Sequence, residues 1–361
     1  MAKRGKLIIY LGYAAGVGKT YAMLREAQRR RAEGADVVIG YFEPHDRPDT
    51  VAQTRGLELI PPKLVVYRGV EFREMDTEAV LARRPQLCVV DELAHTNVPG
   101  SARAKRWQDV ELLRDHGIDV LSNLNVQHLE SLNDQVQQIS GVRVRETVPD
   151  WVVAQAEEVI LVDLTPRALL HRLERGVVYP PERAQRALAH FFREGTLGGL
   201  RELALRQAAH VTEARQEEPA AAPAAGRDRV LIHVTADPES AMLIRRGKRV
   251  ADFIRAACLA VHITAGEDTP NPEATAAVER HLAFARNLRI ETHAISGGEM
   301  AEELVNFARR NRITQVFVLG PERRRDDDAG VELIRRLVRR ARDMQITIVA
   351  RRRTRPGSPH Q

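Results

Sequence analysis

The sequence predicts an α/β protein made of two consecutive domains, each with a parallel β-sheet covered by helices. Short, continuous apolar runs alternate with helix-length segments along both halves of the chain, a pattern typical of parallel sheets buried on both faces. The 361 residues suffice for two domains of ordinary size. Between the halves, residues 213–228 (EARQEEPAAAPAAGRD) are Ala/Pro-rich, have charged ends and lack an apolar period, which indicates a linker.

The first domain is expected to occupy residues 1–212 and to end in a small helical extension. Its predicted strands are the apolar runs at 6–11, 37–41, 64–67, 87–90, 119–121 and 159–162. A helix is predicted over 20–31, directly after the first strand. Beyond Thr165 the pattern becomes helical, and amphipathic helices are predicted over 181–192 and 200–211.

The second domain is expected at residues 229–352, followed by a basic tail at 353–361. Its predicted strands lie at 230–234, 259–263, 289–294, 315–319 and 346–349, with segments of helix length between them. Five strands and four helices in so short a span predict a compact, doubly wound fold of flavodoxin size.

The net charge of +6 comes largely from arginines near the C-terminus, where 335–355 contains nine Arg and one acidic residue. Two interpretations stay open: a solvated helix face plus tail, or a patch for an anionic partner. That stretch has no aromatic residue, so nucleic acid is not an expected partner. No run of about 18 apolar residues occurs, so no transmembrane segment is expected and a cytoplasmic location is predicted.

The clearest local motif is GYAAGVGKT, which follows the first predicted strand and opens the first predicted helix. This is the context of a P-loop (Walker A), in which glycines let backbone N–H groups curl around phosphate oxygens. The residues predicted to bind a nucleoside triphosphate are Gly16, Val17, Gly18, Lys19 and Thr20. Lys19 is expected to neutralise phosphate charge.

The spacing departs from the usual motif, because Tyr13 stands where the first glycine belongs and Gly12 lies one residue earlier. A P-loop also needs an acid near its Mg²⁺ ion. The run LCVVDE delivers Asp91 to the end of a buried strand, so Thr20 and Asp91 are the predicted Mg²⁺ residues. Glu92 is the candidate to activate a water for hydrolysis; the alternative is a solvated or salt-bridged carboxylate.

Longer strings then carry a family resemblance: DELAHTN at 91–97, KRWQDVE at 105–111, NVQHLESLND at 125–134 and LRELALR at 200–206. Together with LGYAAGVGKTYAML, they resemble the N-terminal cytosolic region of the KdpD osmosensitive potassium sensor kinases, almost continuously from residue 6 to 211. The resemblance implies ATP bound with Mg²⁺ at the P-loop and at Asp91.

The resemblance also implies a role in a two-component system that senses potassium or osmotic state. A separate sensor histidine kinase or a response regulator is then the expected partner. His95, Thr96 and Asn97 follow the acid on a loop where a γ-phosphate sensor is expected. Asn125, Gln127 and His128 follow the strand predicted at 119–121, and ordinary loop hydrogen bonding is the alternative role for all six.

The second domain resembles a universal stress protein, the domain that the family carries at this place. Such domains often bind ATP through a glycine-rich loop. Here Arg323 replaces its second glycine, and Val331 replaces the hydroxyl residue after Gly330, so ATP binding in this domain is not expected. A small second messenger such as cyclic di-AMP is the alternative ligand, at 235–240 and 258–262.

Complete members of the family continue into membrane spans and a histidine kinase, and neither is expected in this chain. Three functions stay open: a regulatory ATP-binding sensor, a P-loop ATPase with Glu92 as base, and a non-enzymatic scaffold that binds a second messenger.

Overall fold

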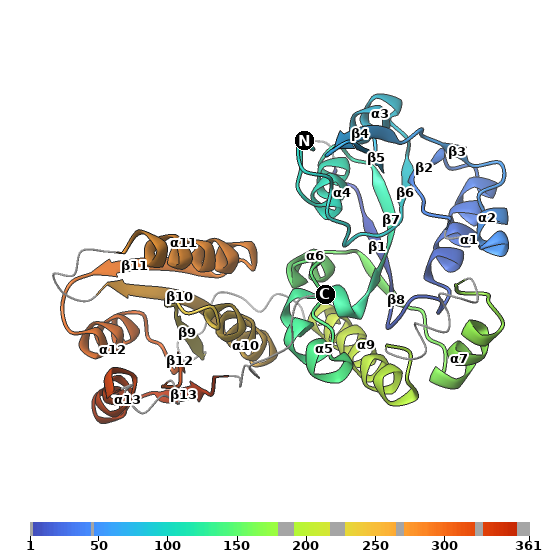
Figure 1. The fold of residues 1–361 in the computed structure, drawn as a ribbon. Coiled ribbons are helices and arrows are strands. Elements are labelled where there is room, and N and C mark those ends of the chain that lie inside the picture. The colour runs from blue at the N-terminus through green and yellow to red at the C-terminus, as the bar shows by residue number, and fades with distance from the viewer. Residues whose placement is uncertain are drawn as a thin grey trace. The chain divides into compact units, whose positions relative to one another are not determined.

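The apolar runs in the first part of the chain form a six-stranded sheet with the order β3-β2-β6-β7-β1-β8 in the computed structural model of the protein (Figure 1). The strands are β1 Leu7–Gly12, β2 Val37–Tyr41, β3 Glu58–Leu59, β6 Leu87–Val90, β7 Asp119–Asn125 and β8 Glu158–Leu161. All neighbouring strands run parallel. Every residue of β1, β2 and β6 is buried, as expected for strands covered on both faces.

The structure describes residues 3–44, 47–179, 191–216, 228–264, 271–321 and 328–351. Backbone contacts divide the chain into two units, Met1–Pro219 and Ala220–Gln361. We call them the first and the second unit. Among the helices described in both units, none combines the length and apolar character needed to cross a bilayer.

Helices cover both faces of the first sheet. The helices that follow strands here are α1 Lys19–Ala32, α2 Pro48–Ala52, α3 Thr77–Arg83 and α4 Arg106–Asp115. Met23, Leu24 and Ala27 of α1 belong to the apolar cluster on one face. Val80 of α3 and Val110 of α4 belong to the cluster on the other.

The strand predicted at 64–67 exists but does not join the parallel sheet, so that expectation was wrong. It forms β4 Lys63–Tyr67, which pairs antiparallel with β5 Val70–Glu74 in a separate hairpin. Arg68 and Gly69 between them both have positive φ, 52° and 78°, as in the tight turns favoured by two-stranded ribbons. A turn this short leaves the chain no length to cross to a parallel neighbour.

The predicted helical extension is present and larger than expected. It contains α5 Asn133–Ser140, α6 Asp150–Ala154, α7 Pro166–Glu174 and α9 Glu194–Gln216, with the short 3₁₀ turns η1 Val126–His128 and η2 Glu130–Leu132 before α5. The helix predicted over 181–192 lies outside the described residues, except for its last two. Because α9 continues to Gln216, the first four residues of the predicted linker are helical.

The second unit has the doubly wound architecture that the sequence predicts. Its sheet order is β11-β10-β9-β12-β13, with all neighbours parallel. The strands are β9 Arg229–His233, β10 Ala257–Thr264, β11 Glu291–Ser296, β12 Gln315–Leu319 and β13 Gln345–Val349. The helices are α10 Ser240–Phe253, α11 Pro272–Asn287, α12 Met300–Arg310 and α13 Asp328–Arg340. The apolar side chains of α10 and α11 belong to one core cluster and those of α12 and α13 to another, and Figure 1 shows the two pairs on opposite faces of the sheet.

The first sheet brings the predicted site residues to one edge. The GVGKT loop follows β1, Asp91 follows β6, and β7 lies between these two strands. Because the strands are parallel, their carboxyl ends meet at the edge where ligands bind in folds of this kind.

Candidate functional site

The loop between β1 and α1 turns on two glycines in left-handed conformation, Gly16 with φ 89° and Gly18 with φ 108°. Residues with a side chain are strained at such angles, so the sequence requires glycine here. Val17 between them is buried in the core beneath the loop. Such turns direct successive N–H groups into one concavity, and α1 begins directly after it at Lys19. The loop therefore shares two left-handed glycines and a helix start with loops that bind anions.

Tyr13 and Gly12 explain the departure from the usual motif spacing. Tyr13 is fully buried, and its hydroxyl donates a hydrogen bond to the carbonyl oxygen of Leu164 at 2.8 Å. A Cβ atom on Gly12 would lie 2.8 Å from Cδ of Lys19. The absence of a side chain at Gly12 thus makes room for the lysine, while Tyr13 anchors the loop to the extension.

Lys19 is buried, with 7% of its surface exposed, and its Nζ donates to the carbonyl oxygen of Ala14 at 3.0 Å. Burial lowers the pKa of Lys19 to about 8; the charge of Asp91 opposes the shift and that of Arg47 adds to it. An ammonium group held in low dielectric interacts strongly with any phosphate that reaches it.

Thr20, Asp91 and Asn123 form one hydrogen-bonded cluster. The Thr20 hydroxyl donates to Asp91 Oδ1 at 3.3 Å. Nδ2 of Asn123 donates to Thr20 Oγ1 at 3.1 Å and also to Asp91 Oδ1. Asn123 lies near the end of β7, so it fills the position between the loop strand and the acid strand.

The oxygens of Thr20 and Asp91 fit a magnesium ion by their chemistry and spacing. Mg²⁺ prefers hard oxygen ligands, and adjacent ligands at about 2.1 Å from one ion stand about 3 Å apart. Within the described ranges, no group of three or more His, Cys, Asp and Glu could hold a metal.

Glu92 has an unusual backbone, with φ 57°. Its N–H group points at both Asp91 Oδ1 (3.2 Å) and Asn123 Oδ1 (3.3 Å). This left-handed residue turns the chain sharply after β6 and separates the two acids, so that Asp91 faces Thr20 while the Glu92 carboxylate meets Arg106.

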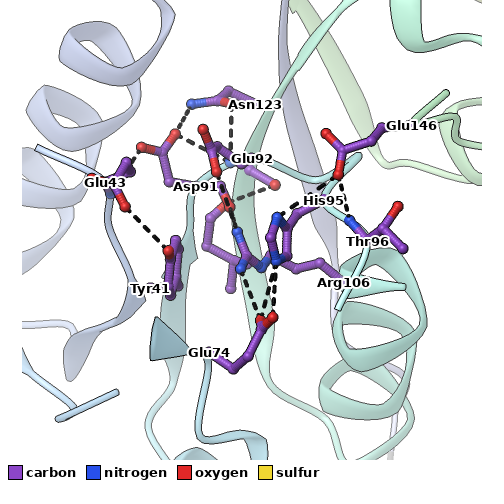
Figure 2. Close-up of polar contacts among 12 residues, drawn as sticks. Tyr41, Glu43, Glu74, Asp91, Glu92, His95, Thr96, Arg106, Asn123 and Glu146 are labelled. Atoms are coloured by element: carbon purple, nitrogen blue, oxygen red, sulfur yellow. Dashed lines mark hydrogen bonds and ion pairs between the residues drawn. The ribbon is translucent and has the colours of Figure 1, made fainter. Parts of the chain in front are cut away.

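Arg106, at the start of α4, is fully buried and stands at the centre of Figure 2. Its Nη1 donates to the Asp91 carbonyl oxygen at 3.3 Å and lies 3.6 Å from Glu92 Oε2. Its Nη2 donates to Glu74 Oε2 at 3.4 Å, and its guanidinium stacks on the Tyr41 ring at 3.7 Å. One cation therefore links the ends of β2, β5 and β6.

The His95–Asn97 loop continues this network away from the cluster of Thr20, Asp91 and Asn123. His95 Nε2 lies 3.1 Å from Glu74 Oε1, and the Thr96 N–H group donates to Glu146 Oε1 at 2.9 Å. Burial alone would raise the pKa of Glu74, but the hydrogen bonds from His95 and from a backbone N–H, together with the Arg106 charge, hold it below its usual value. The Asn97 amide donates to a carboxylate of α4 at 2.7 Å. These residues make the loop hydrogen bonds that were the alternative role.

Asn125 is the last residue of β7, and Gln127 and His128 follow it at the same sheet edge. Burial lowers the pKa of His128, and the charges of Lys19 and Glu92 also act on it. Its Nδ1 lies 2.8 Å from a backbone carbonyl oxygen, so Nδ1 carries the proton. Among the described residues, Asn125 Oδ1 and Gln127 Oε1 are buried acceptors with no hydrogen-bond donor.

Two arginines that sequence reasoning missed lie beside the loop. Arg172 Nη1 donates to the Gly16 carbonyl oxygen at 3.1 Å. Arg47 precedes α2, is half-buried, and donates from Nε and Nη2 to the Val178 carbonyl oxygen at 3.3 Å. Burial lowers its pKa, and the charges of Asp91 and Glu92 act in the opposite direction. Asn123, Arg47 and Arg172 lie in none of the motifs that the sequence offered, and Arg106 lies in KRWQDVE without any sign there of its role, so only the folded chain reveals their contacts.

In the second unit, the predicted second-messenger segment at 235–240 lies at the carboxyl end of β9. Thr235 and Ser240 hydrogen-bond each other there through their hydroxyls at 3.1 Å. Arg351 pairs with Asp237 and donates to the Gly320 carbonyl oxygen at 2.7 Å. Of the residues judged unsuited to ATP, Arg323 lies outside the described residues.

Comparisons with known proteins agree with the resemblance. A family model described as "Osmosensitive K+ channel His kinase sensor domain" matches residues 3–211. Sensor protein KdpD of Mycobacterium tuberculosis is 46% identical over 327 residues, which cover 89% of this chain and 38% of that protein. The Escherichia coli sensor protein KdpD is 43% identical over 328 residues, 89% of this chain and 37% of that protein. The chain thus spans less than two fifths of these relatives.

A relative from Synechocystis sp. is 43% identical over 331 residues, which cover 89% of this chain and 87% of the relative. Among solved structures, a universal stress protein in complex with cAMP is similar with a TM-score of 0.28 and 14% identity, over 35% of this chain and 98% of that one. A universal stress protein from Archaeoglobus fulgidus is similar with a TM-score of 0.29 and 14% identity, over 34% and 97%. On its match to the family model and to these sequence relatives, the chain belongs to the KdpD sensor family.

Proposed function

We propose that the first unit binds ATP with Mg²⁺ and acts as the regulatory nucleotide-binding part of a KdpD-type two-component system that responds to potassium or osmotic state. The observation that carries the proposal is the convergence of Lys19, Thr20 and Asp91 at one sheet edge. The loop glycines, Gly16 and Gly18, supply the backbone of an anion site there.

Each group has a distinct task in this proposal. The loop N–H groups and Lys19 bind phosphate oxygens, and Thr20 and Asp91 hold the metal shell. Asn123 fixes the side chains of Thr20 and Asp91 relative to each other through its two hydrogen bonds. Bound Mg²⁺ supplies positive charge that neutralises the phosphates.

Regulation follows from the network behind Asp91. Arg106 contacts the Asp91 carbonyl and the Glu74 carboxylate, and Glu74 contacts His95. A ligand that contacts Asp91 or Glu92 can therefore act on the His95–Asn97 loop through this network. It shifts the population of two loop conformations if it binds one of them more tightly than the other. The proposed partner, which would contact the His95–Asn97 loop, is a sensor histidine kinase or a response regulator. The proposed location is the cytoplasm.

The second candidate is a P-loop ATPase with Glu92 as base. The place of Glu92 directly after Asp91 at the sheet edge supports this candidate, whereas its ion pair with Arg106 is the salt-bridged alternative and makes the carboxylate a weaker base. Steady-state phosphate release separates the two. An ATPase loses about 100-fold or more of its rate in Glu92→Gln, whereas a switch without turnover releases no phosphate in either form.

The metal site gives a direct test of the main proposal. Calorimetric titration with ATP, with and without Mg²⁺, should show tighter binding with the metal in the wild type. In Asp91→Asn the gain from Mg²⁺ should be lost while metal-free binding is kept. An equal gain in both forms would remove Asp91 from the site.

A further inference from the structure

Arg47 is placed to contact a ligand held by the loop, although it lies 28 positions beyond Lys19 in the sequence. It follows β2, which neighbours β6 in the sheet. Arg47 therefore lies at the same sheet edge as Asp91, which follows β6. Both Nε and Nη2 donate to the carbonyl oxygen of Val178. Val178 covers the loop itself, because a Cβ atom on Gly16 would lie 2.5 Å from its Cγ2. Arg47 thus touches the segment that covers the loop.

The charges around Arg47 favour an anionic ligand. Lys19 and Arg47 each donate to a backbone carbonyl, which accepts a hydrogen bond but does not neutralise a charge. Each is partly or fully removed from water, and the charge of Arg47 acts on Lys19. Asp91 offsets part of this positive charge, because it acts on both Lys19 and Arg47, while Glu92 pairs with Arg106. Two partly desolvated cations held close together raise the free energy of the fold, and a bound polyanion lowers it again.

The two cations differ in the part of the ligand they reach. Lys19 is enclosed under the loop, next to Gly12, where it meets the phosphates that the loop N–H groups hold. Arg47 comes from a different strand, on the side of Asp91, and its planar fork suits the exposed oxygens of a terminal phosphate. Recognition of that phosphate by an arginine of the same chain is a chemically sound role.

We propose that Arg47 binds the terminal phosphate of the nucleotide and so makes the site selective for a nucleoside triphosphate over the diphosphate. This inference rests on the proposed function, namely a nucleotide bound at the loop. The first unit then distinguishes ATP from ADP, and a sensor built on it reports the ratio of the two rather than total nucleotide.

The test compares the affinities of ATP·Mg²⁺ and ADP·Mg²⁺, by calorimetry on the full chain, for the wild type and Arg47→Gln. Loss of a charge-assisted contact should weaken ATP binding by about tenfold to a hundredfold and ADP binding by less than about threefold. Retained ADP binding also shows that the variant is folded. Arg73→Gln on the β4–β5 hairpin removes the same charge outside the sheet and should change neither affinity.

The possible outcomes separate the role of Arg47 from nucleotide binding at the loop. If Arg47→Gln weakens ATP and ADP equally, or weakens neither, the assignment of Arg47 is overturned while nucleotide binding stands. If the wild type binds no nucleotide, the proposed function fails and the inference fails with it. A wild type that binds ATP and ADP equally also contradicts the inference, because no selectivity then exists to assign.

Discussion

At the scale of single residues, the proposed contact between the Lys19 ammonium group and phosphate would make nucleotide binding depend on pH. Its pKa in the folded chain is about 8, below the usual value of 10.5, because the group is buried. The sign follows from this: protonated Lys19 destabilises the fold below pH 8, and that cost disappears as pH rises from 8 towards 10.5. Phosphate binding has the opposite dependence, since it needs the charged form.

We therefore predict that ATP affinity is constant below about pH 8 and falls by up to about tenfold per pH unit above it. In Lys19→Arg, any binding that remains should be independent of pH between 8 and 9.5, because arginine keeps its proton. Calorimetric titrations at several pH values check this. An unchanged wild-type affinity up to pH 9.5 would show that Lys19 does not contact phosphate.

Arg106 is a second buried cation, but unlike Lys19 it forms ion pairs with carboxylates. It is fully buried between Glu74 and Glu92. Replacing it by methionine leaves Glu74, which is 5% exposed, without its cation, so Arg106→Met should destabilise the first unit by about 3–5 kcal/mol.

Adding Glu74→Gln to Arg106→Met removes the uncompensated carboxylate and should restore about 1–2 kcal/mol of that loss. Urea unfolding of the wild type, both single variants and the double variant measures the coupling. Strictly additive losses would mean that Arg106 and Glu74 do not stabilise each other.

At the scale of elements, two glycines at the two ends of α1 separate the effect of backbone strain from the effect of close packing on stability. Gly16 and Gly34 both have positive φ, 89° and 93°. A Cβ atom on Gly34 meets nothing within 4 Å, whereas on Gly16 it would meet Val178 at 2.5 Å.

Gly34→Ala should therefore cost only about 1 kcal/mol of backbone strain and leave ATP binding intact. Gly16→Ala should cost more than about 2 kcal/mol, because overpacking adds to the strain, and should weaken ATP binding. Thermal unfolding and ATP titration of both variants check this. Equal effects on stability and binding would contradict the packing of Val178 on the loop.

The elements also show what a single sequence can reveal. Apolar runs such as 37–41 and 87–90 predicted their strands because burial on both faces leaves a continuous signal. The strand predicted at 119–121 ended too early, since Ser122 and Asn123 are polar. In the fold the Ser122 hydroxyl donates to the Val90 carbonyl oxygen at 2.6 Å, so the strand continues. Such partners lie 32 residues away and leave no local pattern.

For the same reason the sequence revealed only part of the site. Lys19, Thr20 and Asp91 belong to contiguous motifs whose chemistry is readable from neighbouring residues. Arg106 and Arg47 act through partners that only the sheet order brings near. The hairpin at 63–74 was misplaced because a single strand carries no record of whether its neighbour is parallel.

At the scale of the whole molecule, the two units have separate apolar cores. One pair of clusters contains residues between Leu7 and Val211, and the other pair contains residues between Val230 and Val349. The two tryptophans of the chain, Trp107 and Trp151, lie in the first unit, with ring centroids 5.4 Å apart. Tryptophan fluorescence thus reports on one unit and circular dichroism on both.

We predict that ATP·Mg²⁺ raises the fluorescence-detected unfolding midpoint and leaves a second, dichroism-detected transition unchanged. At 100 times the dissociation constant the stabilisation should be about 2.7 kcal/mol. If nucleotide raises both transitions together, the units are coupled or the ligand binds elsewhere.

The proposal that underlies all these predictions is that the loop of the first unit binds the phosphates of a nucleotide. A calorimetric titration of the full chain with ATP·Mg²⁺, performed on the wild type and on Lys19→Ala, tests it most directly. We expect one site per chain in the wild type and binding at least about 100-fold weaker in the variant, the loss expected for a buried, charge-assisted phosphate contact. Equal affinity in the two proteins would show that Lys19 and the loop do not bind the phosphates.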